Sequence, residues 1–414
     1  MKKVINIFLI ILVFLTGCNR SLSINSVSNL YNNNLETLKT GTFKVKSYPN
    51  QIVVKFKGNP SQVQVTSLMN KYKSRIIKFS KIVGTYILNV SNYDTIALSK
   101  QISQEPIIEY AEPNYKFGIK FTVNDPKSRE QTGLAMVNIA KAWDITLGNP
   151  KVIIATVDTG IDLSHPDLKN KLVQGYNVIT EGQTPPKDDN GHGTHAAGIA
   201  AAVTDNKIGI AGTAPLCKIM PIKALDSKGE SGPVEIASGI VWAVDHGASV
   251  INLSLGGQVD SITIKRAVDY ALYNNVAVVA ATGNESTTTP CYPASYPGVI
   301  SVGSIDQNRE LSQFSNHGSW MSVVAPGSNI LSTMPTYTVT LNSEGYSKEY
   351  DFMDGTSMAS PMVAGIVALM RSRHPEMSPS MIKSKLESTS IDLGERGFDP
   401  IFGHGLVNAY KAVY

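Results

Sequence analysis

The chain has 414 residues, of which 42% are hydrophobic and 17% are charged. This composition excludes a largely disordered protein, and the length exceeds what one core usually supports, so we expect one large domain and a smaller one. The 37 basic and 33 acidic residues give a net charge of +4 and form no dense basic block, which argues against a nucleic-acid partner.

The first element in the chain is a predicted export signal. Two lysines precede an apolar run over residues 4–15, which is too short to span a bilayer comfortably. The run ends in the tetrapeptide LTGC, which resembles a bacterial lipobox and ends at Cys18. We therefore predict a lipoprotein signal over 1–17 and lipidation of Cys18, which would anchor an exported protein to the bacterial cell envelope or surface. An ordinary cleaved signal with a chance cysteine is the alternative.

A flexible tether and a small unit follow the signal. Residues 18–42 are rich in Ser and Asn and need no fold, whereas the small unit spans 43–115. Strands are expected at 51–56, 75–79, 85–90 and 107–110, and helices at 61–73 and 94–103. The order βαββαβ is that of a ferredoxin-like α+β fold.

A linker over 116–135 leads to a large domain over 136–414, in which strands and helices alternate. Buried strands are expected at 151–157, 249–255, 276–281, 298–303 and 321–325. Helices are expected at 191–202, 233–246 and 261–274. This alternation predicts an α/β fold with a parallel sheet covered by helices on both faces, and a functional site at the carboxyl ends of the strands.

Two polar residues stand where such a site is expected. Asp158 ends the first strand of the large domain, where an aspartate can also simply cap a turn. His192 opens a helix within NGHGTHAAG, and an imidazole titrates near neutrality, as a general base requires. The spacing of His192 and His195 does not match the HExxH zinc motif, and no carboxylate ligand accompanies it, which disfavours a metal site.

Ser357 lies within GTSMASPMVAG, where an apolar helix begins. Its hydroxyl becomes a strong nucleophile only when a base removes the proton, and the start of a helix favours the negative charge that forms. A serine before a helix can also act as an N-cap. The chain order Asp, His, Ser differs from the order in chymotrypsin-type and α/β-hydrolase triads.

The segments VDTGID, GHGTHAAG and GTSMASPMVAG resemble the three signatures of the subtilisin family, and the resemblance extends from about Trp143 to the end of the chain. It implies a subtilisin-like fold and a serine endopeptidase, a hydrolase that uses Asp158, His192 and Ser357 as a triad and needs no cofactor for catalysis.

The segment EYAEPN at 109–114 resembles the end of the propeptide that precedes many such domains. The small unit is therefore expected to be an inhibitory propeptide removed by self-processing; a permanent accessory domain is the alternative.

The same resemblance implies further site residues. Asn284 matches the oxyanion-hole residue, which would donate its side-chain amide to the charge that develops in the transition state. An asparagine that merely follows a strand in a turn is the alternative. The implied substrate-binding residues are Ser254, Leu255, Gly256 and Gly283. Main-chain pairing along them suits a polypeptide, with either an apolar side chain in the pocket or, because of Glu285, a basic one.

The segment 204–210 resembles a calcium-binding loop of the family. The ligands that it implies are Asp167 and Asn206 with the carbonyl groups of Thr204, Ile208 and Ile210. Oxygen donors of this kind suit a hard cation, although a polar surface turn would look similar. We expect such a calcium ion to be structural and not catalytic.

Other functions remain open on the sequence alone. A surface-tethered peptide-binding protein could keep a protease fold without turnover, and a maturation protease with one partner precursor would differ from a scavenging enzyme only in pocket shape. A serine esterase is disfavoured because no GxSxG elbow is present.

We expect a monomer, and we expect free thiols at Cys217 and Cys291, which are too few for a disulfide framework.

Overall fold

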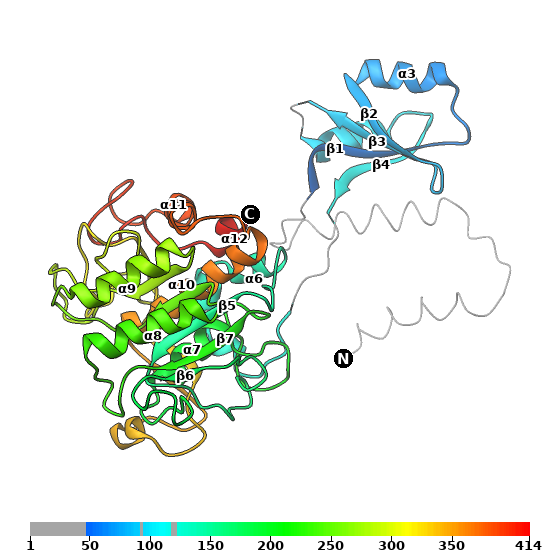
Figure 1. Cartoon of the computed structure of the whole chain (residues 1–414). Helices are drawn as coiled ribbons and strands as arrows, with labels where there is room; N and C mark the ends of the chain where they lie inside the picture. Colours follow the sequence, from blue (N-terminus) through cyan, green and yellow to red (C-terminus); the bar gives the residue numbers. More distant parts are fainter. Residues whose placement is uncertain (1–46, 92–93, 117–121) are drawn as a thin grey trace, which may run out of the picture. The chain divides into compact units, whose positions relative to one another are not determined.

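The computed structural model describes residues 47–91, 94–116 and 122–414. It divides the chain between two compact units, Met1–Gly118 and Ile119–Tyr414 (Figure 1). The predicted signal peptide, Cys18 and the tether lie outside the described residues. Within the described residues, no helix is both long enough and apolar enough to cross a bilayer.

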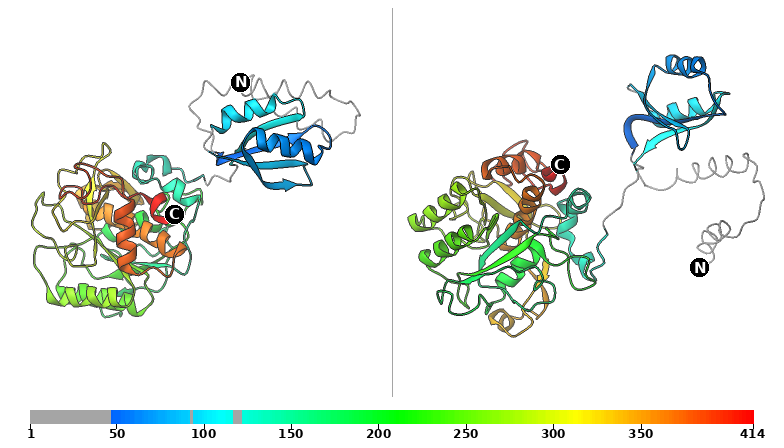
Figure 2. Two further views of the ribbon diagram at one scale, coloured as in Figure 1. Left: turned by 90° about the horizontal axis from the view of Figure 1, so that it is seen from above. Right: turned by 45° about the vertical axis from the view of Figure 1, so that its right-hand side comes forward.

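The smaller unit is a four-stranded antiparallel sheet with two helices packed on one face (Figure 2). Its elements are β1 (Ser47–Phe56), α3 (Gln62–Lys71), β2 (Ser74–Ser80), β3 (Thr85–Val90), α4 (Thr95–Ser103) and β4 (Ile108–Tyr115). Ser61 and Asp94 cap the two helices through their side chains, as serine and aspartate before a helix commonly do. The strand order β2-β3-β1-β4 confirms the predicted ferredoxin-like fold.

The larger unit is built on a seven-stranded sheet whose strands all pair in parallel, in the order β11-β10-β9-β8-β5-β7-β6. The strands are β5 (Ile153–Asp158), β6 (Tyr176–Asn177), β7 (Lys218–Lys223), β8 (Val250–Leu253), β9 (Ala277–Ala281), β10 (Ile300–Ile305) and β11 (Val323–Pro326). A separate antiparallel pair is formed by β12 (Ile330–Thr333) and β13 (Tyr350–Met353).

Helices cover both faces of the parallel sheet. They are α5 (Thr132–Met136), α6 (Ile139–Trp143), α7 (His192–Ala201), α8 (Pro233–Asp245), α9 (Ile262–Tyr273), α10 (Thr356–Arg373), α11 (Pro379–Thr389) and α12 (Ala409–Val413), with 3-10 turns at Ser128–Glu130 and Thr340–Glu344. Side chains alternate across each strand, so Ile154 and Val250 pack in the core that contains α7 and α10. Ala155 and Ile251 pack in the opposite core, with α8 and α9. The predicted α/β architecture is confirmed (Figures 1 and 2).

Strand β7 was not among the predicted strands, because Pro221 interrupts its apolar run and proline is rare inside a sheet. Pro221 pairs with Thr156 of β5 on one side. Its carbonyl points to the other side, where a Cβ atom added at Gly175 would lie 2.2 Å away. The nitrogen of a strand residue points to the same side as its carbonyl, and β6 pairs only with the last two residues of β7. Residues 171–173 also pair with β7 on that side, at Ile219, so the ladder is interrupted at Pro221, where the N–H is missing.

Candidate functional site

The candidate site gathers where strands of the parallel sheet end and two helices begin. Asp158 is the last residue of β5, and His192 and Ser357 open α7 and α10. Ser254 directly follows β8, and Asn284 comes soon after β9. Because parallel strands end at one edge of a sheet, five segments that are far apart in sequence meet there.

Asp158 and His192 are in direct contact. The Asp158 carboxylate is completely buried, and its Oδ1 lies 2.8 Å from Nδ1 of His192 while also accepting a hydrogen bond from the Thr159 N–H. Burial alone would lower the pKa of His192, but the charge of Asp158 and this hydrogen bond together raise the pKa above its ordinary value. With Nδ1 engaged by the carboxylate, Nε2 is the nitrogen of the neutral ring that can accept a proton.

The Ser357 hydroxyl is bound to the chain that follows β8 and not to His192. Its Oγ donates to the carbonyl of Ser254 at 3.1 Å, and the Ser254 hydroxyl donates back to the carbonyl of Ser357 at 2.8 Å. That carbonyl is free because Pro361, four residues later in α10, has no N–H to donate within the helix. The structure thus joins Ser357 to the predicted substrate-binding strand.

Asn284 is oriented by Thr356, a residue that the sequence analysis did not single out. The amide oxygen of Asn284 accepts from both the N–H and the hydroxyl of Thr356, each at 2.9 Å. The amide nitrogen is therefore turned away from Thr356. A Cβ atom added at Gly355 would lie 3.5 Å from this nitrogen and 3.6 Å from the N–H nitrogen of Ser357, so two donors flank one small space.

The predicted substrate-binding glycines come close to a buried thiol. A Cβ atom added at Gly256 would lie 2.7 Å from Sγ of Cys291, and one at Gly283 would lie 3.3 Å from it. Leu255, directly before Gly256 in the chain after β8, is half-buried. Burial and the charge of Glu285 raise the pKa of Cys291 to about 11, so the thiol is protonated. Cys217 and Cys291 are both free, as expected.

Asn316 organises the wall beside Gly283, and sequence reasoning missed it because no motif surrounds it. This residue is fully buried. Its amide nitrogen donates to Glu285 at 2.5 Å and to the carbonyl of Thr282 at 3.0 Å, while its oxygen accepts from the Glu285 N–H. Gly283 has φ of 96°, and a Cβ atom there would lie 2.4 Å from the Asn316 amide, so only glycine fits.

His195, the second histidine of the motif, takes no part in this arrangement. Its ring is fully buried and Nε2 lies 3.1 Å from the carbonyl of Asp351. Burial lowers the pKa of His195 to about 3, which keeps the ring neutral. Nowhere in the described part of the chain do three or more His, Cys, Asp or Glu side chains converge, as a zinc site built from such side chains would require.

The segment predicted to bind calcium wraps around Asp167. This carboxylate is fully buried and accepts from the Asn206 amide at 2.8 Å and from the Ile210 N–H and the Tyr350 hydroxyl at 3.0 Å each. Burial raises the pKa of Asp167 against these hydrogen bonds. Asn206 thus presents its nitrogen to Asp167, while its oxygen accepts from the Ile208 N–H at 2.7 Å. Thr204 contributes its hydroxyl to the Gly212 N–H.

Asp125 is a second buried carboxylate at this segment, and sequence reasoning had left it inside the linker. Its two oxygens accept from the N–H groups of Asp205 and Asn206 at 2.8 and 3.0 Å. In the described residues neither Asp125 nor Asp167 forms an ion pair with a basic side chain. Two buried carboxylates without a cationic partner are hard oxygen donors of the kind that calcium prefers, and here their oxygens accept from N–H and hydroxyl groups.

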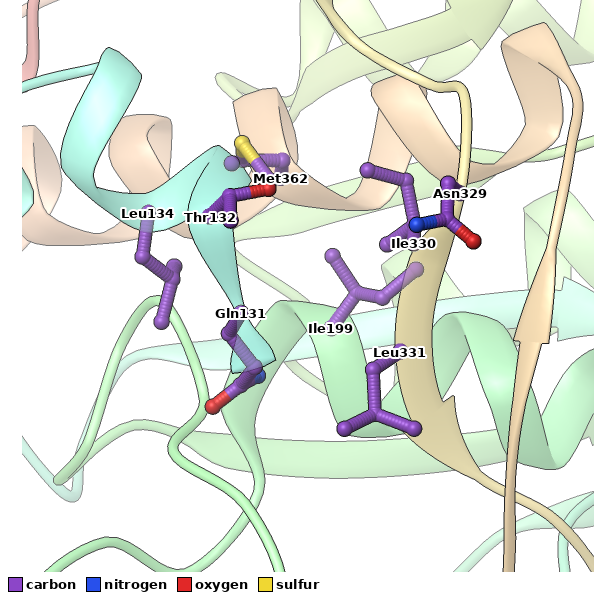
Figure 3. A pocket seen from close by; sticks show the side chains of 9 residues that line it. Gln131, Thr132, Leu134, Ile199, Asn329, Ile330, Leu331 and Met362 are labelled. Atoms are coloured by element: carbon purple, nitrogen blue, oxygen red, sulfur yellow. The ribbon is translucent and has the colours of Figure 1, made fainter. Parts of the chain in front are cut away.

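A different recess lies between α5, α7, β12 and α10 (Figure 3). Its lining comprises Gln131, Thr132, Gly133, Leu134, Ile199, Asn329, Ile330, Leu331 and Met362. None of these side chains is ionisable or nucleophilic enough for acid–base chemistry. None of the residues of the candidate site lines the recess, so it is separate from that site.

Comparison with known families gives two matches. Residues 149–405 match the subtilase family, and residues 37–114 match the fervidolysin N-terminal prodomain. Each of the two ranges lies within one of the two structural units.

Individual relatives agree with these matches. The chain is 42% identical over 328 residues to the thermophilic serine proteinase of Bacillus sp. (strain AK1), covering 79% of this chain and 77% of that protein. It is 45% identical over 294 residues to thermitase of Thermoactinomyces vulgaris, covering 71% of this chain and 99% of thermitase. The crystal structure of fervidolysin from Fervidobacterium pennivorans, a keratinolytic enzyme related to subtilisin, superposes with a TM-score of 0.65 at 31% identity, covering 91% of this chain and 62% of fervidolysin.

Proposed function

The chain belongs to the subtilase family of serine peptidases and carries a fervidolysin-type prodomain, and on that premise we propose that it is an endopeptidase that cleaves polypeptides through an acyl-enzyme intermediate. The observation that carries this proposal is the 2.8 Å contact between Asp158 and His192 at the edge of the sheet where α10 presents Ser357.

In this mechanism His192 is the general base. The Ser357 hydroxyl leaves the Ser254 carbonyl, gives its proton to Nε2 of His192, and forms a bond from Oγ to the peptide carbonyl carbon. Asp158 holds the ring through Nδ1 and stabilises the imidazolium. The same proton then passes to the leaving amine as the peptide C–N bond breaks, and water releases the acyl group by the reverse sequence.

The negative charge on the carbonyl oxygen would be stabilised by Asn284 and the N–H of Ser357. Both donors flank one space, and the Asn284 amide is held in place by Thr356 before any substrate arrives. Preorganised donors of this kind accelerate the chemical step because the charge exists only in the transition state.

The substrate is an extended peptide that would run along Ser254, Leu255 and Gly256, with one side chain entering the pocket beside Gly283. Exposed glycines on the strand after β8 leave its main chain accessible, which supports main-chain pairing. The Glu285 carboxylate is engaged by Asn316 at 2.5 Å, and this favours an apolar side chain in the pocket over a basic one.

The prodomain would act as an intramolecular inhibitor that the enzyme removes by cutting itself. The match of residues 37–114 to a prodomain supports this, and so does the separate hydrophobic core of the small unit. The export signal and LTGC tetrapeptide support export and anchoring of the uncut chain to the cell envelope through a lipid on Cys18. We propose the domain limits predicted from the sequence, which are a signal peptide over 1–17, a tether over 18–42, a prodomain over 43–115, a linker over 116–135 and a large domain over 136–414.

The pH dependence of peptide hydrolysis tests this function. Because only the neutral His192 ring can accept the serine proton, activity is lost as the ring is protonated. The pKa of His192 is raised, so kcat/KM on an internally quenched peptide should fall on the acid side at a pH above the ordinary histidine value of 6.5.

A matched control is His246→Gln, which removes an exposed histidine at the end of α8 and should leave the profile unchanged. An acid limb below pH 6.5, or hydrolysis that does not change with pH through neutrality, would contradict the proposed role of His192.

We also propose that a calcium ion stabilises the large unit without entering the reaction. Asp167 would hold it with carbonyl groups of Thr204, Ile208 and Ile210, and Asp125 would add a second carboxylate. Asn206 would join them only with its amide oxygen turned toward the ion. When bound, calcium would neutralise these buried carboxylates and cross-link the segment around Asp125 to residues 204–210.

Chelation should therefore lower the thermal stability of the enzyme. A ligand at 100 times its Kd stabilises a protein by about 2.7 kcal/mol, so EDTA should lower the Tm of the large unit by about 5–10 °C. Differential scanning calorimetry would measure this in a Ser357→Ala background, which prevents self-digestion.

Asp167→Asn should remove the response to EDTA, whereas Asp226→Asn, in an exposed loop elsewhere, should keep it. A wild-type Tm that EDTA does not change would rule out a stabilising calcium ion. A full response in Asp167→Asn would show that the ion binds at another site.

A further inference from the structure

The turn that presents His192 has no side chain at the N-cap position of α7 to stabilise it. Residues 188–191 lie outside any helix or strand, and His192 follows them as the first residue of α7. Gly191, the N-cap of α7, has φ of 119° and no side chain that could cap the helix. Glycine also leaves the backbone more freedom than any other residue. The position of His192 must therefore be fixed by groups other than an N-cap side chain, some within the turn, such as the Asn190 amide oxygen that accepts from the His192 N–H, and some outside it.

One of these groups is the carboxylate of Asp188, which is completely buried. It accepts hydrogen bonds from the N–H groups of Asn190, Gly191 and Thr194 and from the hydroxyls of Thr159 and Thr194. The Thr159 hydroxyl in turn accepts from the N–H of Gly193, next to His192. Asp188 thus replaces the missing cap and links the start of α7 to the residue after Asp158.

The backbone of the turn is held by the segment between β12 and β13. The Tyr337 hydroxyl donates to the carbonyl of Asp188 at 2.8 Å. The N–H groups of Thr340 and Leu341 donate to the next two carbonyls, those of Asp189 and Asn190, at 3.1 and 3.0 Å. Three successive carbonyls of the turn are therefore bound by one segment that is about 150 residues away in sequence.

This segment is itself anchored and closely packed. The N–H and hydroxyl of Thr336 donate to the Asp162 carboxylate at 2.9 and 2.7 Å, directly before Tyr337. A Cβ atom added at Gly191 would lie 3.0 Å from Cε of Met334 and 3.3 Å from Cδ1 of Leu341. There is no free space into which the turn could shift without displacing the segment.

We propose that Tyr337 is a positioning residue for His192: by fixing the Asp188 carbonyl, its hydroxyl holds the turn whose carboxylate caps α7, and so keeps the imidazole against Asp158. This inference rests on the proposed function, in which His192 is the general base. Tyr337 does not need to touch the substrate in order to act.

The surroundings of Tyr337 suit a permanent donor. Burial and the nearby carboxylates of Asp162, Asp188 and Asp189 raise its pKa well above the usual range, so the phenol stays protonated at working pH. The ammonium group of Lys187 lies 3.9 Å from the centre of the ring and holds it from the solvent side. The charged groups that act on the His192 ring itself are Asp158 and Asp188.

The test is Tyr337→Phe in the full chain, which removes only the hydroxyl. We expect kcat on a peptide substrate to fall about tenfold with KM unchanged, because the base is misplaced while the substrate strand is intact. The acid limb of kcat/KM should also move to lower pH, because a loosely held ring gains less from the Asp158 charge. Fluorophosphonate labelling of Ser357 should slow to a similar extent.

Tyr346→Phe is the matched control, since Tyr346 lies in the same segment and its side chain is also half-buried, but its hydroxyl does not bond to the turn. It should keep the wild-type kcat and pH profile. Unchanged kcat and pH profile in Tyr337→Phe would overturn the inference, and so would a rise in KM alone or a lower Tm with normal kcat. His192→Ala distinguishes failure of the proposed function from failure of the positioning role. Full activity in His192→Ala would refute the proposed function. Loss of activity in His192→Ala together with normal activity in Tyr337→Phe would refute only the positioning role of Tyr337.

Discussion

Ser357→Ala should abolish proteolysis, with kcat on a peptide substrate falling about 10⁶-fold, the size of effect seen when the nucleophile of such a triad is removed. The alanine side chain cannot form the acyl-enzyme bond, although the two oxyanion donors remain. Fluorophosphonate labelling should disappear at the same time. If the prodomain is removed by the enzyme itself, the variant should also accumulate as the uncut precursor.

Intact-mass measurement and N-terminal sequencing of both forms would separate the processing steps. Lipidation depends on the signal and on Cys18, so the wild type before cleavage and the Ser357→Ala variant should carry the same lipid mass. Only the wild type should lose the prodomain. Cleavage of a protein substrate by Ser357→Ala at the wild-type rate would contradict the proposed nucleophile, and full prodomain removal in that variant would assign the cut to another protease.

Asn284→Leu should lower kcat by about 10²–10³-fold with little change in KM. The leucine side chain has the same branching and the same number of heavy atoms but cannot donate to the oxygen that becomes charged in the transition state. Steady-state kinetics on a peptide substrate would measure the two constants separately. Asn284→Asp keeps the oxygen that accepts from Thr356, and it should be at least as slow because it lacks the donor.

The control for this pair is Asn274→Leu, at the end of α9 and at the opposite edge of the sheet, which should keep the wild-type constants. If Asn284→Leu raised KM and left kcat unchanged, Asn284 would bind the ground state of the substrate. That result would refute its role in stabilising the oxyanion.

The sequence predicted the parts of this protein that depend on local patterns. The βαββαβ order of the small unit and the principal strands and helices around the site follow from hydrophobic periodicity and caps. Asp158, His192 and Ser357 were proposed because each lies in a motif at the end of a strand or the start of a helix. The structure brings Asp158 into contact with His192, whereas Ser357 bonds to Ser254.

What the sequence could not predict depends on contacts between distant segments. Pro221 interrupts the apolar run of β7, and only the fold shows that it lies at an interruption between two short stretches of pairing. Asp125 lies in the predicted linker, and its role becomes visible only from the hydrogen bonds that the N–H groups of residues 205 and 206 donate to its carboxylate. Asn316 and Tyr337 stand in no motif, and each gains its role from a backbone group more than 30 residues away.

The two hydrophobic cores of the large unit differ in whether they contain the helices that carry the catalytic residues proposed here. His192 and Ser357 come from α7 and α10, which pack in one core, whereas the core with α8 and α9 holds neither residue. Repacking the second core therefore changes resistance to heat with little effect on the reacting groups. In laboratory evolution of this enzyme for harsh conditions, the smaller of the two cores is therefore the one open to variation, and the larger one is constrained by chemistry.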